Sequence, residues 1–195
     1  GGVDFVVVIW LPVESPAIPV VGAWDEARPR TAILYHRAYL FDLWRIAQPI
    51  EVTDLDSAKQ RMLTAIRAEV SDERVMLALE RVRREEFVPE ESRHLAYDDG
   101  PLPIGHGQTI SQPLIVALMV GALELRRTDK VLELGGGSGY QAALISEIAA
   151  SVITVERIPS LAEEARARLR SLGFHRVEVV DAAHELGWRL GAPYD

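Results

Sequence analysis

A glycine-rich turn between an apolar strand and a helix constrains this chain more than any other feature. The turn spans residues 135–139 and contains four glycines. It follows the apolar segment 130–134, and helical and extended patterns then alternate, with helices predicted at 140–150 and 159–172 and strands at 152–156 and 176–180. This order predicts a parallel sheet with helices on its faces, so the expected fold class is α/β with a doubly wound sheet.

Acidic residues stand at or near the ends of the predicted strands. They are Glu133, Glu156 and Asp181. Because the carboxyl ends of parallel strands meet at one edge of a sheet, these side chains should converge beside the turn. There Glu156 can accept hydrogen bonds from both hydroxyls of a ribose, and Asp181 can meet an adenine amino group. The glycines that permit close approach of a ligand are Gly135, Gly137 and Gly139. The pattern predicts a nucleoside site.

The glycine pattern fits two kinds of nucleoside ligand. A dinucleotide fingerprint fits only when it is counted from Gly137, where it ends at Ala142 and leaves Glu133 without a role. Glutamate two residues before Gly-x-Gly-x-Gly instead resembles the S-adenosylmethionine motif of Rossmann-like methyltransferases. That resemblance implies S-adenosylmethionine as the cofactor, with Glu133 near its methionine moiety. A purely structural turn is harder to reconcile with three acidic residues at strand ends.

The segment 87–112 is rich in glycine, proline and aspartate, and we expect it to form a long loop without secondary structure. Such loops are uncommon and are often functional. On Leu102-Pro-Ile-Gly105, Gly107-Gln-Thr-Ile-Ser-Gln-Pro113 and Gly137-Ser-Gly-Tyr-Gln-Ala-Ala143 the chain resembles the protein-L-isoaspartate O-methyltransferase family. The resemblance covers about residues 65–195, and the run 107–113 is its most specific part.

This resemblance implies an enzyme that transfers a methyl group from S-adenosylmethionine to the free α-carboxyl of L-isoaspartyl residues in damaged proteins. Isoaspartyl-containing peptides and proteins are then the expected partners, and Ser111 is the expected catalytic residue. The expected cofactor-binding residues are Thr109, Ile110, Glu133, Gly135, Gly137, Gly139, Glu156, Asp181 and Ala182. The expected substrate-binding residues are Leu102, Pro103, Ile104, Gly105 and Gln108.

The chemistry of this reaction suits the residues available. A free α-carboxyl has a pKa of about 3.5 and is already an anion at neutral pH, so no general base is required. What remains is positioning, which can lower a barrier by roughly 7–11 kcal/mol. We expect the Ser111 hydroxyl to donate a hydrogen bond to the substrate carboxylate, not to act as a covalent nucleophile, since no partner base is in evidence. The alternative is that Ser111 caps the helix that Pro113 opens.

Two departures from the family pattern affect these expectations. Val180-Asp-Ala-Ala183 stands where the family usually has Gly-Asp-Gly, so the methyl of Ala182 lies beside the expected adenine edge. Residues 193–195 resemble the start of the fourth strand of the family, so we expect a sheet truncated after its third strand. The first strand, 130–134, would then be an unpaired apolar edge. A longer gene product is the preferred explanation. The alternatives are that residues 1–58 or a second chain cover that edge.

We divide the chain into an N-terminal extension of unknown role, 1–58, and a methyltransferase domain, 59–195. In the extension, the apolar run 5–11 predicts a buried strand and the pattern over 31–47 predicts a helix. Further along, Ser71 is the expected N-cap of a helix that continues through Val82.

Composition excludes several function classes. The chain has no cysteine, which excludes thiolate zinc sites, and its histidines lack metal-ligand spacing, so we expect no metal. With 21 basic and 29 acidic residues the net charge is −8, which argues against binding to nucleic acid or anionic membranes. No targeting or spanning segment is evident, so we expect a cytoplasmic protein. His106 stands out among the histidines because it lies inside the loop motif, and Arg166, Arg168 and Arg170 indicate a solvated helix face.

Three other functions remain open. A catalytically inactive, methyltransferase-like fragment could bind a nucleoside or a protein partner without turnover. A nucleic-acid amino methyltransferase usually carries an Asn/Asp-Pro-Pro-Tyr type motif, which Ala192-Pro-Tyr-Asp195 is not. A dehydrogenase is the least favoured, because the dinucleotide register fits poorly.

Overall fold

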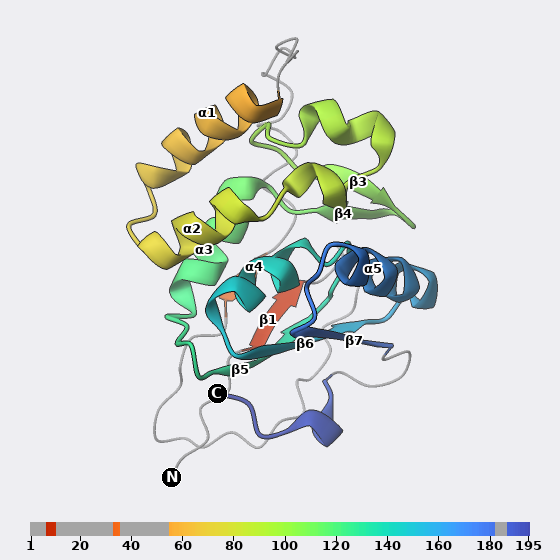
Figure 1. Ribbon diagram of the computed structural model, residues 1–195. Coiled ribbons are helices and arrows are strands. Elements are labelled where there is room, and N and C mark those ends of the chain that lie inside the picture. The colour runs from red at the N-terminus through yellow and green to blue at the C-terminus, as the bar shows by residue number, and fades with distance from the viewer. Residues whose placement is uncertain (1–6, 11–32, 36–54, 182–186) are drawn as a thin grey trace.

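The computed structural model describes residues 7–10, 33–35, 55–181 and 187–195. Its main feature is a five-stranded parallel sheet in the order β2-β1-β5-β6-β7 (Figure 1). The strands are β1 (Val7–Trp10), β2 (Ile33–Tyr35), β5 (Lys130–Leu134), β6 (Ser151–Glu156) and β7 (Val177–Asp181). The expected α/β class with a parallel sheet is confirmed.

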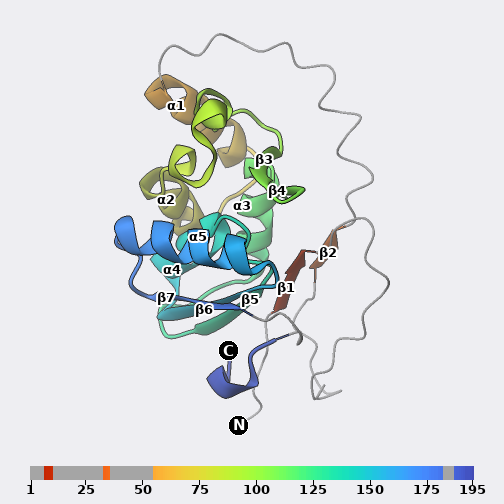
Figure 2. The same cartoon turned by 90° about the vertical axis from the view of Figure 1, so that its right-hand side faces the viewer.

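Five α-helices are described, and two of them pack directly on the sheet. They are α1 (Leu55–Arg67), α2 (Glu73–Arg81), α3 (Pro113–Ala122), α4 (Tyr140–Ile148) and α5 (Pro159–Ser171). In Figure 2, α4 and α5 lie over one face of the sheet, with α1 and α2 farther out. Proline stands in the first turn of both α3 and α5, as expected, because its missing N–H would have no intrahelical partner there. No helix in the described residues is long and apolar enough to cross a membrane.

Strands β5, β6 and β7 are buried on both faces. Val131, Val152 and Val179 join the large core formed with the helices. Their neighbours along the strands form a second cluster on the opposite face, where Tyr194 and Trp188 of the C-terminal segment pack against it. The members from the strands are Leu132, Leu134, Ile153, Val155 and Val180. This two-sided burial explains why the strands are almost continuously apolar.

The expected unpaired edge of the first methyltransferase strand is covered by a strand of the N-terminal extension. β1 pairs in parallel with β5, with Val8 opposite Glu133, and β2 pairs with the other side of β1. The expectation of an open apolar edge at 130–134 is therefore wrong, and the alternative in which residues 1–58 cover it is the one that the structure supports.

The helix predicted at 31–47 is wrong at Ile33–Tyr35, which form strand β2. A short apolar run cannot by itself distinguish helix from strand, and here pairing with β1 decides the outcome. The strand predicted at 5–11 is confirmed at Val7–Trp10. The remaining residues of both predictions lie outside the described residues.

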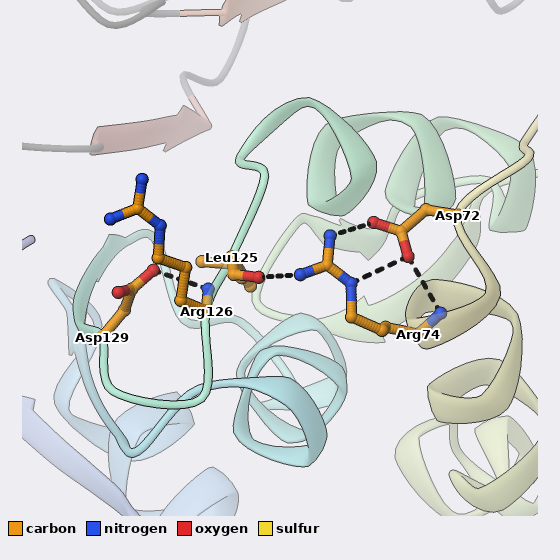
Figure 3. A network of polar contacts seen from close by, with 5 residues as sticks. All are labelled: Asp72, Arg74, Leu125, Arg126 and Asp129. Carbon is orange, nitrogen blue, oxygen red and sulfur yellow. Dashed lines mark hydrogen bonds and ion pairs between the residues drawn. The ribbon is translucent and has the colours of Figure 1, made fainter.

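The N-terminus of α2 is fixed by Asp72 and not by Ser71 as expected (Figure 3). The Asp72 carboxylate accepts the backbone N–H of Arg74 at 2.9 Å and also receives two bonds from its guanidinium. The same guanidinium donates to the carbonyl of Leu125, just after α3. Aspartate serves the cap better because its charge also holds the arginine that joins α2 to α3.

The segment expected to be a structureless loop contains ordered elements. Two 3-10 helices, Arg84–Phe87 and Glu90–Leu95, precede an antiparallel hairpin made of β3 (Leu102–Gly105) and β4 (Gln108–Ile110). The hairpin turn has positive φ at His106 and Gly107, 51° and 69°. Both central residues of a type I′ turn require positive φ, and this geometry matches the twist of a hairpin. Glycine next to histidine was the sequence signal for this turn.

A buried arginine connects the segment before the hairpin with the helix after the glycine turn. Arg84 is fully buried, and its Nε donates to the carbonyl of Ala96 at 2.7 Å. Its guanidinium lies 5.0 Å from the ring centroid of Tyr140, the first residue of α4. Because a desolvated cation needs such partners, this contact fixes the entry to the hairpin relative to the glycine turn.

Candidate active site

The turn between β5 and α4 adopts a backbone that only glycine accommodates well. Gly135, Gly137 and Gly139 have φ of 90°, 53° and 89°. The N–H groups of Gly135 and Gly136 both donate to the carbonyl of Val155 on β6, at 2.8 and 3.1 Å. Gly139 N–H closes the turn on the carbonyl of Gly136 at 2.8 Å. The turn is therefore anchored to the neighbouring strand and leads directly into the N-terminus of α4.

Glu156 ends β6 beside this turn, as the sequence predicts. One carboxylate oxygen accepts the N–H of Gly137 at 2.8 Å, and the other accepts the N–H of Ile158 at 2.9 Å. Each oxygen retains a lone pair, so the fixed carboxylate can still accept hydrogen bonds from a diol. Asp181 is opposite Glu156 in the register of β6 and β7 and is exposed at the same end of the sheet.

Glu133 is a buried carboxyl behind the turn. It is 2% exposed and accepts a hydrogen bond from the hydroxyl of Thr154, its partner in the register of β5 and β6. Burial raises the pKa of Glu133 to about 7, against the lowering effect of the hydrogen bonds from Thr154 and Gln141. Thr154 also explains the glycine at 136, because a Cβ there would come within 2.6 Å of its Oγ1.

The β3–β4 hairpin meets the glycine turn. A Cβ at Gly137 would lie 3.4 Å from Cδ1 of Ile104, so this β3 side chain lies beside the turn and occupies the space next to this glycine. Leu102 and Ile110 are opposite each other in the hairpin and are buried, as is Ile104. Pro103 is opposite Thr109, with proline exposed and threonine half-buried. The remaining predicted residues of the hairpin, Gly105 and Gln108, flank its turn.

Ser111 lies between β4 and α3 and is half-buried. The N-cap of α3 is Gln112, which makes no side-chain cap bond, so the alternative that Ser111 caps this helix is wrong. Gln112 instead donates to the carboxylate of Asp99 at 2.7 Å. The Ser111 hydroxyl is thus not committed to the helix end.

Comparison with known proteins agrees with this arrangement. Residues 57–195 match the family model for protein-L-isoaspartate(D-aspartate) O-methyltransferase. The chain belongs to this family. A protein-L-isoaspartate O-methyltransferase 1 of Rhodopseudomonas palustris is 55% identical over 126 residues, which cover 65% of this chain and 51% of that protein. The protein-L-isoaspartate O-methyltransferase of Ignicoccus hospitalis is 50% identical over 146 residues, which cover 72% of this chain and 69% of that protein.

Solved structures of the family share the fold. One protein-L-isoaspartate O-methyltransferase superposes with a TM-score of 0.62 at 29% identity, covering 70% of this chain and 46% of that chain. A putative protein-L-isoaspartate O-methyltransferase from Plasmodium falciparum, in complex with S-adenosyl-L-homocysteine, superposes with a TM-score of 0.55 at 22% identity. The match covers 64% of this chain and 62% of that chain. The chain thus spans only about half the length of several relatives it matches, including 51% of the Rhodopseudomonas protein.

The structure brings most of the predicted site residues of this family member to one end of the sheet. Glu156 and Asp181 lie at adjacent strand ends beside the glycine turn, Glu133 lies behind it, and the hairpin lies over it. Ala182 lies outside the described residues. Among the described residues, no cluster of three or more His, Asp or Glu side chains could hold a metal ion.

Sequence reasoning missed two side chains that hold the turn. Thr154 bonds Glu133 through its hydroxyl, and Arg168 donates to the carbonyl of Ser138 at 3.0 Å. Threonine opposite Glu133 could have been found from the parallel register of β5 and β6, in which Glu133 pairs with Thr154. Arg168 had no local signal, since its contact crosses from α5 to the turn.

Replacing Glu133 with glutamine should remove a pH dependence of stability. The pKa of Glu133 is raised from 4.5 to about 7 in the folded chain. Above pH 4.5 the carboxyl ionises more readily in the unfolded chain than in the folded chain, so the free energy of unfolding falls as the pH rises toward 7. As pH rises from about 5 to about 8, the wild type should lose roughly 3 kcal/mol of unfolding free energy relative to Glu133→Gln. Urea denaturation across this pH range measures the difference. The exposed Glu178→Gln provides the control, and parallel pH profiles of wild type and Glu133→Gln would contradict the expectation.

Proposed function

We propose that this chain binds S-adenosylmethionine beside the glycine turn and methylates the free α-carboxyl of L-isoaspartyl residues in proteins. Family membership and the placement of the hairpin over the turn support this proposal. The observation that carries it is the position of Ile104 beside Gly137, because it brings the segment expected to bind substrate next to the segment expected to bind cofactor.

The residues present fit this cofactor. Glu156 is held by two backbone N–H groups and keeps acceptor capacity for the ribose hydroxyls. Asp181 is exposed one strand away, where an adenine amino group would reach it. Glu133 offers a buried carboxyl toward the methionine part, and Thr109 and Ile110 line the site from β4.

When bound, the cofactor supplies a sulfonium-activated methyl group. The chain has then to position a carboxylate oxygen in line with it and exclude water. We assign this positioning to Ser111, whose hydroxyl donates to one oxygen of the substrate carboxylate and leaves the other free to attack. The substrate backbone lies along β3, where Leu102, Pro103, Ile104 and Gly105 meet Gln108 across the hairpin. We assign these roles to a methyltransferase domain of residues 59–195. The extension, residues 1–58, supplies strands β1 and β2 to the sheet of this domain.

A matched pair of peptides tests the function. The 195-residue chain is incubated with methyl-labelled S-adenosylmethionine and two peptides that differ only in an isoaspartyl or aspartyl linkage. Label transferred to the isoaspartyl peptide alone is the expected result, released as methanol on base treatment as a methyl ester requires. Cofactor binding without transfer would instead identify an inactive nucleoside-binding member of the family, and equal labelling of both peptides would exclude isoaspartyl specificity.

A further inference from the structure

One face of α5 carries three polar side chains that contact both the hairpin and the glycine turn. Ser160, Glu164 and Arg168 are four residues apart and therefore lie in one row along the helix. We call this row the α5 stripe. The sequence indicated a solvated helix face at Arg166, Arg168 and Arg170. That interpretation is wrong for Arg168, whose guanidinium is turned to the glycine turn, and for Arg166, which is half-buried and donates to the carbonyl of Val179 at 2.9 Å.

Arg168 holds the middle of the turn. Its Nη1 donates to the carbonyl of Ser138 at 3.0 Å, and the side chain is half-buried. Burial lowers the pKa of Arg168, and the nearby carboxylate of Glu164 opposes that effect. The N–H groups of Gly135 and Gly136 donate to β6, and that of Gly139 donates within the turn. The hydrogen bond from Arg168 to the carbonyl of Ser138 adds an anchor from α5. A hydrogen bond from a charged donor is among the stronger ones.

The other end of the α5 stripe contacts the tip of the hairpin. The Oγ of Ser160 lies 3.3 Å from Nε2 and 3.4 Å from Nδ1 of His106. A carboxylate oxygen of Glu164 lies 3.6 Å from the same Nε2. In Figure 1 the hairpin lies directly over α5, as these contacts require. His106 is one of the two positive-φ residues of the hairpin turn, so this contact is made at the tip of the hairpin.

We infer that the α5 stripe is a clasp that keeps the hairpin and the glycine turn at a fixed separation, with Arg168 as a positioning residue for the turn. The inference rests on the proposed function for its consequence, which is cofactor affinity. Because Glu156 is held by the N–H of Gly137, a loosened turn presents this carboxylate less well to the cofactor. Loss of the clasp should therefore raise Kd and KM for S-adenosylmethionine more than it lowers kcat.

Arg168→Met tests the turn end of the clasp. Methionine retains the aliphatic packing but removes the donor, and titration calorimetry should show S-adenosylmethionine binding weakened about tenfold, in line with the loss of a charged hydrogen bond. Arg168→Lys, which keeps a charged donor, should recover part of the affinity. The control is Arg170→Met, at an exposed site on the same helix, which should stay within about twofold. Unchanged binding in Arg168→Met, or an equal loss in Arg170→Met, would overturn the inference.

Amide hydrogen exchange tests the clasp independently of the proposed function, because it is measured without cofactor. Without cofactor, the amides of 135–140 should exchange several-fold faster in Arg168→Met than in the wild type or Arg170→Met. If the wild type binds no S-adenosylmethionine, the proposed function fails, and the exchange result alone then decides the clasp: unchanged exchange over 135–140 excludes it.

A double-mutant cycle tests the hairpin end. His106→Asn preserves the positive φ, which asparagine tolerates, but shortens the side chain, and Glu164→Gln removes the charge. Each should speed exchange in the hairpin about two- to fivefold, as expected for an exposed pair. The double variant should be no faster than the faster single variant, because both remove one interaction. Multiplicative effects, or an equal effect of the exposed neighbour Glu163→Gln, would contradict the clasp.

Discussion

Replacing Ser111 with alanine should lower methyl transfer to an isoaspartyl peptide by well over ~10-fold while S-adenosylmethionine still binds. Ser111 is half-buried at the junction of β4 and α3, and the N-cap of α3 is Gln112, so the substitution removes no helix cap. Loss of the hydroxyl removes the donor that we assign to the substrate carboxylate. The reaction would then proceed from a less ordered carboxylate, which affects kcat.

The comparison needs a serine whose loss touches neither the fold nor the site. Ser71 is exposed just before α2, and Asp72 supplies the cap of that helix, so Ser71→Ala is a suitable control. Initial rates with the isoaspartyl peptide and calorimetric Kd for the cofactor are measured for both variants. Near-normal turnover in Ser111→Ala would remove its assigned role, and loss of cofactor binding would reassign it to that subsite.

The parts of the site that could be predicted from the sequence are those encoded locally. Positive φ in a tight turn demands glycine, and a strand end is visible from the apolar run before it, so the turn and Glu156 were placed correctly. The segment 102–110 shows the limit of this reasoning. Its glycines and prolines suggested irregular structure, although glycine at 105 and 107 was the turn chemistry of a hairpin.

Contacts between distant segments could not be predicted in this way. The pairing of β1 with β5 depends on an apolar edge that becomes available only when the sheet forms. The same holds for Arg168, which looks like one of several surface arginines until α5 is packed against the turn. Helical periodicity identifies the buried face of a helix, but it does not show which long polar side chain reaches back over that face.

The second large effect is expected at Gly139, the residue that leads from the turn into α4. It has φ of 89°, and a Cβ there would lie 2.9 Å from Cδ1 and 3.1 Å from Cγ of Leu169. Leu169 is 1% exposed and has little room to move. Gly139→Ala should therefore lower the free energy of unfolding by about 2–4 kcal/mol, because it combines backbone strain at positive φ with overpacking against Leu169. Urea denaturation measures it, and cofactor affinity should fall with the displaced turn.

Gly173 separates these two costs. It has nearly the same φ, 83°, at the end of α5, but nothing lies within 4 Å of the position of its Cβ. Gly173→Ala should thus show the backbone cost alone, about 1 kcal/mol. Shortening Leu169 to alanine in the Gly139→Ala background should relieve the clash, so the double variant should be less destabilised than the sum of the single variants. Equal losses in Gly139→Ala and Gly173→Ala, or strict additivity with Leu169→Ala, would show that α5 does not restrict the turn at this point.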